Sequence, residues 1–250
     1  MLTMNEPLSP APSHSVAQVD SAHRQSPDLP VAKVSRLAVF GGSFDPIHNG
    51  HLSLAQAVVD AGLADEVLFV PARRPPHKST RDLSAGLHRV EMIRLTLEAH
   101  PAFSVSDIEM ERGEGFSYTF DTLSVLRQVF PEHELFFLMG MDSLRELHCW
   151  HKAGELVQHF GFLVYPRPGV SCPSLAELSD RFGARNGRRL LDSVKSELPP
   201  FPFSSTEVRG ACAQGSDLSR YCPEVVCRYI AAQGLYSASS KAQTSRGTAT

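Results

Sequence analysis

The chain has 250 residues, of which 42% are hydrophobic and 20% charged, and its 24 basic and 27 acidic side chains give a net charge of −3. Such a chain can form one large globular domain or two small ones. The acidic balance argues against a nucleic-acid partner, and no apolar run approaches the roughly 20 residues of a membrane span. Because the N-terminus lacks a basic start followed by an apolar stretch, we expect a cytoplasmic protein without a secretory signal.

The cysteines and the two ends of the chain narrow the description further. The cysteines form no CxxC pair and their number is odd, which is typical of reduced thiols rather than of a zinc cage. Residues 1–35 are rich in proline, serine and alanine without apolar periodicity, so we expect a flexible extension there. We expect a folded domain over residues 36–236 and a flexible tail over 237–250.

Inside this domain, short apolar runs alternate with stretches of helical periodicity. In chain order, the sequence predicts a strand over 37–40, a helix over 51–63, a strand over 67–70, a helix over 87–97, a strand over 104–107, a helix over 118–129, strands over 135–138 and 161–165, and a helix over 175–182. The helix over 87–97 is expected to bury Leu87, Val90, Ile93 and Leu97 on one face. A helix start at 203–209 and a closing helix within 223–236 follow, whereas the rest of 171–202 has no readable pattern.

The predicted strands are apolar without alternation, which is typical of strands buried on both faces. This pattern predicts a doubly wound, Rossmann-like α/β domain, with a parallel sheet flanked by helices. In such sheets the ligand lies at the carboxyl ends of the strands, near the point where the strand order reverses.

The segment 41–51, GGSFDPIHNGH, follows the first predicted strand. Gly41 and Gly42 allow a sharp turn and a close approach of a ligand to the main chain. His48 and His51 are three residues apart at a predicted helix start, where free amide groups favour an anion. A glycine-rich turn with two exposed or capping histidines fits these residues as well. A metal site would need further ligands, which the sequence does not offer nearby.

The whole segment resembles the signature of the nucleotidyltransferases with a His-x-Gly-His motif, which bind ATP and transfer its adenylyl group. Seven further stretches in the same order resemble the bacterial nicotinate mononucleotide adenylyltransferases: PPHK at 75–78, SYT at 117–119, GMDS at 140–143, Trp150, RPG at 167–169, FSSTEVR at 203–209 and the closing helix within 223–236, which is structural. The resemblance extends from residue 36 to residue 236, about four fifths of the chain. Phe203 stands where this family more often has isoleucine, and 171–202 matches too poorly to assign any residue.

Each stretch also has a plain structural interpretation. The segment 75–78 could be a solvated turn, and the hydroxyls of 117–119 could cap a helix. A single tryptophan such as Trp150 is more often a core residue than a platform for a ligand. Asp142 could cap a helix, and Arg167 could pair with an acidic side chain.

The resemblance implies two sets of site residues, with His48 and His51 as the catalytic pair. The ATP set comprises Gly41, Gly42, Ser43, Phe44, His48, His51, Arg167, Ser204, Ser205, Thr206 and Arg209. The nicotinate mononucleotide set comprises Ser43, His77, Lys78, Tyr118, Thr119, Gly140, Asp142, Trp150 and His151. No acidic cluster for a metal is visible, so Mg²⁺ is expected to arrive with ATP.

The implied reaction transfers the adenylyl group of ATP to nicotinate mononucleotide and releases pyrophosphate. A related enzyme with another acceptor, such as nicotinamide mononucleotide or phosphopantetheine, is the nearest alternative. A non-catalytic nucleotide sensor on the same fold is a second alternative, although both phosphate-binding signatures are intact. The oligomeric state cannot be inferred from these residues.

Overall fold

The computed structural model describes residues 34–75, 83–112, 115–200 and 203–237. Apart from residues 34, 35 and 237, the extension and the tail expected from the sequence lie outside these ranges. None of the helices in the described ranges is long and apolar enough to cross a membrane.

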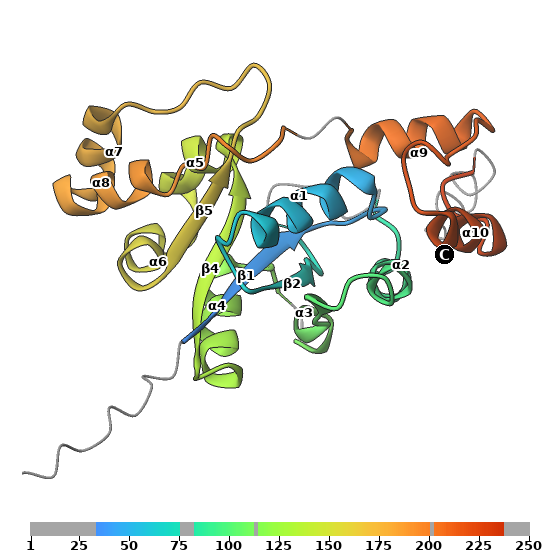
Figure 1. Cartoon of the computed structure of the whole chain (residues 1–250), viewed down its shortest axis with the longest axis horizontal. Coiled ribbons are helices and arrows are strands. Elements are labelled where there is room, and N and C mark those ends of the chain that lie inside the picture. Colours follow the sequence, from blue (N-terminus) through green and yellow to red (C-terminus); the bar gives the residue numbers. More distant parts are fainter. Residues whose placement is uncertain (1–33, 76–82, 113–114, 201–202, 238–250) are drawn as a thin grey trace, which may run out of the picture. The chain divides into compact units, whose positions relative to one another are not determined.

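In the described part of the chain, five parallel strands form one sheet (Figure 1). They are β1 (Ser35–Gly42), β2 (Glu66–Pro71), β3 (Phe103–Val105), β4 (His133–Gly140) and β5 (Gly161–Tyr165). Their order is β3-β2-β1-β4-β5, with Phe40 of β1 opposite Phe69 on one side and Leu138 on the other. The strand order therefore reverses between β1 and β4, and the predicted doubly wound α/β fold is confirmed.

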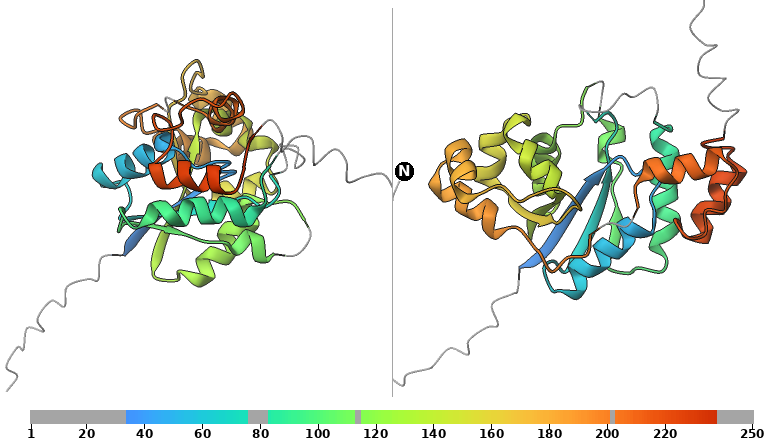
Figure 2. Two further views of the ribbon diagram at one scale, coloured as in Figure 1. Left: turned by 90° about the vertical axis from the view of Figure 1, so that its right-hand side faces the viewer. Right: turned by 90° about the horizontal axis from the view of Figure 1, so that it is seen from above.

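Helices cover both faces of this sheet (Figure 2). One core cluster joins the sheet to α1 (Asn49–Asp60), α2 (Gly86–Leu97), α9 (Ser205–Ala213) and α10 (Glu224–Ala232). The other joins it to α4 (Thr119–Val129), α5 (Met141–Glu146), α6 (Ala153–His159), α7 (Leu175–Phe182) and α8 (Ala184–Asp192). A short helix, α3 (Ile108–Glu111), follows β3, and a 3₁₀ turn spans Leu147–Cys149.

The alternation along β1 shows why both faces need a cover. Ala38 and Phe40 belong to the first core cluster, whereas Leu37 and Val39 belong to the second, and all four side chains are buried. Because successive strand residues point to opposite faces, an uninterrupted apolar run supplies both cores at once.

Several details of the secondary structure differ from the sequence-based predictions, and helices α5 and α6 were not predicted. Leu87 is 77% exposed rather than on the buried face, and in the first turn of α2 the buried side chain is that of Arg89. β3 ends at Val105, and the following residues lead into α3, which was not predicted. Helix α8 was also missed, because its sequence ARNGRRLLD is mostly polar and buries only Gly187 and Leu190.

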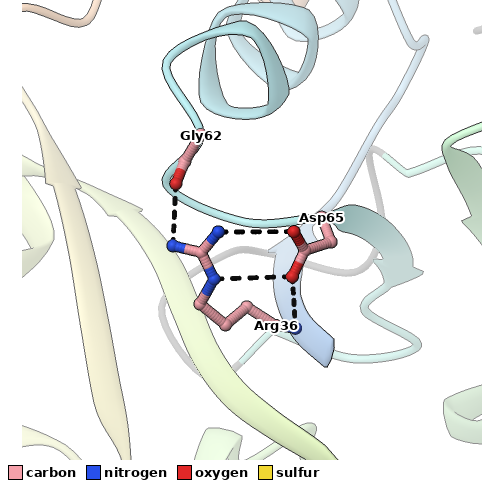
Figure 3. Close-up of polar contacts among 3 residues, drawn as sticks. All are labelled: Arg36, Gly62 and Asp65. Atoms are coloured by element: carbon pink, nitrogen blue, oxygen red, sulfur yellow. Dashed lines mark hydrogen bonds and ion pairs between the residues drawn. The ribbon is translucent and has the colours of Figure 1, made fainter. Parts of the chain in front are cut away.

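The amino end of β1 is tied to the turn between α1 and β2 by Arg36 (Figure 3). Its main-chain N donates to Asp65 Oδ2 at 2.8 Å, and its Nη2 lies 3.3 Å from Asp65 Oδ1. Its Nη1 donates to the main-chain oxygen of Gly62 at 2.7 Å. This network fixes the start of the central strand.

Candidate active site

A cavity of about 540 Å³ lies at the carboxyl ends of β1 and β4, where the strand order reverses. Its wall contains every residue of the predicted ATP set: Gly41, Gly42, Ser43, Phe44, His48, His51, Arg167, Ser204, Ser205, Thr206 and Arg209. Two helices, α1 and α9, begin at this wall. Because helix starts present unpaired amide groups and a partial positive charge, the cavity is suited to an anion.

The two histidines at the start of α1 cap the helix reciprocally. His48 is the N-cap, and its Nδ1 accepts the amide N–H of His51 at 3.4 Å, while His51 Nδ1 accepts the amide N–H of His48 at 3.2 Å. The two rings stack with centroids 3.7 Å apart. An Nδ1 that accepts a hydrogen bond places the proton of a neutral ring on Nε2. The capping interpretation is therefore correct, and it leaves each imidazole as an Nε2–H donor beside the cavity.

The side chain of His48 is 2% exposed. Burial lowers its pKa from 6.5 to about 4, although the nearby carboxylate of Glu207 acts in the opposite direction. His48 is therefore neutral at neutral pH and acts as a hydrogen-bond donor rather than as a resident cation.

Helix α9 begins with a second capping box. Ser204 Oγ accepts the amide N–H of Glu207 at 3.2 Å, and the Glu207 carboxylate accepts the Ser204 amide N–H at 2.7 Å. The next hydroxyl, Ser205 Oγ, donates to the main-chain oxygen of Pro46 at 3.1 Å. Arg209 Nη1 donates to the main-chain oxygen of Asp45 at 2.7 Å. Helix α9 is thereby attached to the loop that carries the histidines.

Asp142 and Arg167 form an ion pair across the ends of β4 and β5. Arg167 Nε lies 3.3 Å from Asp142 Oδ1, and the Arg167 guanidinium lies 5.5 Å from the centre of the Tyr165 ring. A Cβ on Gly140 would come within 2.3 Å of Asp142 Oδ1, so only glycine permits this approach. The N-cap of α5 is Gly140, without a side-chain hydrogen bond, so the interpretation of Asp142 as the capping residue is not supported.

A second cavity, of about 460 Å³, shares six lining residues with the first: Gly41, Gly42, Ser43, Phe137, Ser143 and Trp150. Its wall includes five residues of the predicted mononucleotide set: Ser43, Tyr118, Thr119, Trp150 and His151. The rings of Tyr118 and His151 stack at 4.3 Å, and Trp150 packs edge-on against Phe137 at 5.9 Å. The exposed lining of the second cavity is mostly apolar, whereas that of the first is mostly polar, so the second accepts a flat ring better than a phosphate.

Some predicted residues lie elsewhere. Gly140 and Asp142 border the first cavity, although the resemblance assigned them to the mononucleotide set. His77 and Lys78 lie outside the described residues. The hydroxyls of 117–119 do not cap α4: its N-cap is Tyr118, without a side-chain bond, and Ser117 Oγ accepts the amide N–H of Arg74 at 3.1 Å.

Glu109 was missed, and its buried carboxylate borders the second cavity. Its Oε1 accepts a hydrogen bond from Thr122 Oγ1 at 2.7 Å, and its Oε2 accepts the amide N–H of Arg73 at 3.3 Å. In the sequence it lies in a short polar stretch without periodicity, so no signal distinguished it from surface acids. Tyr165, which lines the first cavity, was also missed. It is the last residue of an ordinary apolar strand, and nothing in the sequence marked it as a site residue.

Within the described ranges, no group of three or more His, Cys, Asp or Glu side chains is arranged to hold a metal ion. Of the described residues lining the first cavity, Asp142 is the only carboxylate, and it is already paired with Arg167. The donor set of this wall therefore suits an anion rather than a resident cation.

Comparison with known proteins gives consistent results. The family model described as cytidylyltransferase-like matches residues 39–211. The nicotinate-nucleotide adenylyltransferase of Bacillus subtilis (strain 168) is 36% identical over 203 residues, which cover 81% of this chain and 99% of that protein. A probable nicotinate-nucleotide adenylyltransferase of Symbiobacterium thermophilum is 38% identical over 205 residues, covering 81% and 96%. A structure titled Plasmodium falciparum nicotinic acid mononucleotide adenylyltransferase complexed with NaAD is 20% identical, with a TM-score of 0.63 over 81% of this chain and 97% of that one, and supports the fold.

Proposed function

Since this chain belongs to the cytidylyltransferase-like family and, within it, to the nicotinate-nucleotide adenylyltransferases, we propose that it transfers the adenylyl group of ATP to nicotinate mononucleotide. The products are nicotinate adenine dinucleotide and pyrophosphate. The observation that carries this proposal is the pair of cavities that share the wall formed by Gly41, Gly42 and Ser43. One has the character of a phosphate site and the other that of a site for an aromatic ring.

In the proposed reaction, an oxygen of the 5′-phosphate of the mononucleotide attacks the α-phosphorus of ATP. The bond between the α-phosphorus and the bridging oxygen breaks, and that oxygen leaves with pyrophosphate. Because the attacking oxygen is already anionic, the enzyme needs no nucleophilic side chain of its own. Its tasks are to align two anions that repel each other and to stabilise the charge that develops during transfer.

The groups around the first cavity suit these tasks. The Nε2–H donors of His48 and His51 and the amide groups at the start of α9 can bind phosphate oxygens without introducing a competing base. We assign His51 to the transferred phosphate and Arg167 and Arg209 to the nucleotide. ATP enters as its Mg²⁺ complex, because the described residues of this wall offer a metal little more than one paired carboxylate.

The second cavity accommodates the pyridine ring in this proposal. Trp150 and the stacked pair of Tyr118 and His151 provide the flat surfaces. The remaining predicted residues for the acceptor phosphate, His77 and Lys78, belong to this proposal on the strength of the sequence resemblance alone.

The test is to incubate the purified protein with Mg-ATP and one acceptor at a time, and to measure pyrophosphate and identify the dinucleotide by mass spectrometry. We expect the highest kcat/KM with nicotinate mononucleotide, compared with nicotinamide mononucleotide and phosphopantetheine. In a Trp150→Ala variant the acceptor KM should rise at least tenfold more than the ATP KM. A protein that binds ATP but releases no pyrophosphate with any acceptor would overturn the proposal.

A further inference from the structure

The loop between β1 and α1 is held in place through its main-chain oxygens. This loop carries His48. Side chains from distant parts of the chain donate hydrogen bonds to the main-chain oxygens of four residues between positions 43 and 47. Arg89 Nη1 donates to the oxygen of Ser43 at 2.8 Å, Arg209 Nη1 to that of Asp45 at 2.7 Å, Ser205 Oγ to that of Pro46 at 3.1 Å and Cys222 Sγ to that of Ile47 at 3.5 Å. The position of the histidine pair therefore depends on α2, α9 and the C-terminal region.

The side chain at the centre of this loop is a fully buried carboxylate, Asp45. Its Oδ1 accepts a hydrogen bond from the hydroxyl of Tyr236 at 2.6 Å, and its Oδ2 accepts the amide N–H of Ser84 at 3.3 Å. The buried guanidinium of Arg89 interacts with it electrostatically. Burying a charge without partners is very unfavourable, so each of these groups constrains where Asp45 can lie.

Tyr236 is 191 positions further along the chain, just beyond the closing helix α10. Its φ angle of 60° lies in the left-handed region, which residues other than glycine rarely adopt. Burial, together with the Asp45 carboxylate, raises the pKa of its hydroxyl, so the hydroxyl remains protonated and acts as the donor. An unfavourable backbone conformation is thus retained where it aims one hydroxyl at one carboxylate oxygen.

We propose that Tyr236, acting through Asp45, is a positioning residue for the His48–His51 pair, an inference that rests on the proposed adenylyl transfer. Tyr236 is not among the described residues that line either cavity. Asp45 lies three residues before His48, and its neighbour Phe44 packs edge-on against the His51 ring at 4.9 Å. A shift of Asp45 should therefore move His48 through the main chain and His51 through the ring of Phe44.

The effect on the reaction follows from the short range of phosphate contacts. A displacement of about 1 Å at groups that stabilise a transition state can lower the rate by up to about 100-fold. The aromatic side chains of the second cavity come from Tyr118 just before α4, from Phe137 on β4 and from the segment around Trp150, and none of the contacts above involves them. Loss of the Tyr236 hydroxyl should therefore lower kcat and leave the KM for the acceptor unchanged.

The experiment compares Tyr236→Phe with a matched control, Tyr229→Phe. Both remove one hydroxyl from the C-terminal region, but that of Tyr229 lies 2.9 Å from His88 Nδ1 and links α10 to α2 without touching the loop. Wild type and both variants are assayed for kcat, both KM values and Tm, and the imidazole ¹H–¹⁵N resonances of the histidines are recorded by NMR. We expect Tyr236→Phe to lose about tenfold in kcat, keep its acceptor KM within twofold, and shift the resonances of His48 and His51. Tyr229→Phe should leave kcat, the acceptor KM and the resonances of His48 and His51 unchanged.

The outcomes separate this inference from the proposed function. A wild-type protein that forms no dinucleotide refutes the function, whereas the histidine resonances still report on positioning. An unchanged kcat in Tyr236→Phe, or histidine resonances that do not move, overturns the positioning role. Equal losses in both tyrosine variants would also overturn it, because they would reflect general destabilisation of the C-terminal region.

Discussion

The two ends of β1 are both held by arginines that donate to main-chain oxygens, but the arginines come from different places. At the amino end, Arg36 lies on the strand itself and binds the adjacent turn at Gly62 and Asp65. At the carboxyl end, Arg89 and Arg209 reach in from α2 and α9 and bind the loop after the strand. The contacts of Arg36 span 26 and 29 positions of the sequence, whereas those of Arg89 and Arg209 with the loop span 46 and 164.

This difference separates support for the fold from support for the site. The Arg36–Asp65 pair is part-exposed, with 29% and 31% of the two side chains accessible, and such pairs contribute little to stability. At the other end the carboxylate of Asp45 is fully buried, so its partners cannot be lost without a large effect on the loop. In a parallel sheet the site lies in the loops that follow the strands. The sheet itself does not fix such a loop, so contacts from other elements, here α2 and α9, keep it in position.

The largest effect is expected from removing a ring at the carboxyl end. A His51→Ala variant should lose about 2.7–4 kcal/mol of transition-state stabilisation, the amount associated with one missing donor in an oxyanion site. The kcat of dinucleotide formation would fall by about 100- to 1,000-fold, and rapid-quench turnover measurements would detect it. A turnover equal to that of wild type would remove His51 from the reaction.

A smaller effect is expected from adding one methyl group to the wall shared by the cavities. The Cβ of a Gly41→Ala variant would come within 2.9 Å of Phe137 Cε2, so this ring must move. Overpacking of this kind costs about 1–3 kcal/mol, which urea unfolding would measure. Gly154→Ala is the matched control in α6, where an added Cβ meets nothing within 4 Å, and it should be neutral or slightly stabilising. Equal losses in both variants would contradict this account.

The third prediction concerns the dependence of stability on pH. The pKa of His48 is about 4 in the folded protein and 6.5 in the unfolded chain, so the unfolded chain binds more protons between these values. The stability of the folded state that is present above pH 6.5 is therefore lost as the pH falls toward 4. Between pH 7 and pH 5, wild type should lose about 2 kcal/mol more unfolding free energy than a His48→Asn variant. Asparagine preserves an N-cap acceptor, and parallel stability curves for the two proteins would argue against a depressed pKa.

The smallest effect is expected at the amino end of β1. An Arg36→Met variant removes the guanidinium but keeps the main-chain bond to Asp65, so it should lose only about 0.2–1 kcal/mol of stability. Its kcat should equal that of wild type, since no described contact of Arg36 reaches the cavities. If kcat fell tenfold, the proposed separation between the two ends of the strand would be wrong.

The sequence predicted the sheet well because the strands are buried on both faces and therefore read as short apolar runs. The β5 and α7 boundaries agree with those predicted, whereas α8 was invisible because most of its residues are polar. The sequence predicted that the two histidines belong to one site, and the structure places both at one cavity, but their reciprocal capping was not predicted. Nothing in the spacing of two histidines specifies which ring nitrogen faces which amide. The contact between Asp45 and Tyr236 spans 191 positions, and no local pattern can predict it.

The ion pair between Asp142 and Arg167 leaves part of the acid available to a ligand. The contact involves one carboxylate oxygen, Oδ1, and half of the Asp142 side chain is accessible, so Oδ2 can accept a ligand hydroxyl while the pair persists. A pair this exposed also costs little to break. In either case the Arg167 guanidinium keeps its charge and stays beside the same cavity, so an incoming nucleotide meets an acceptor and a cation together.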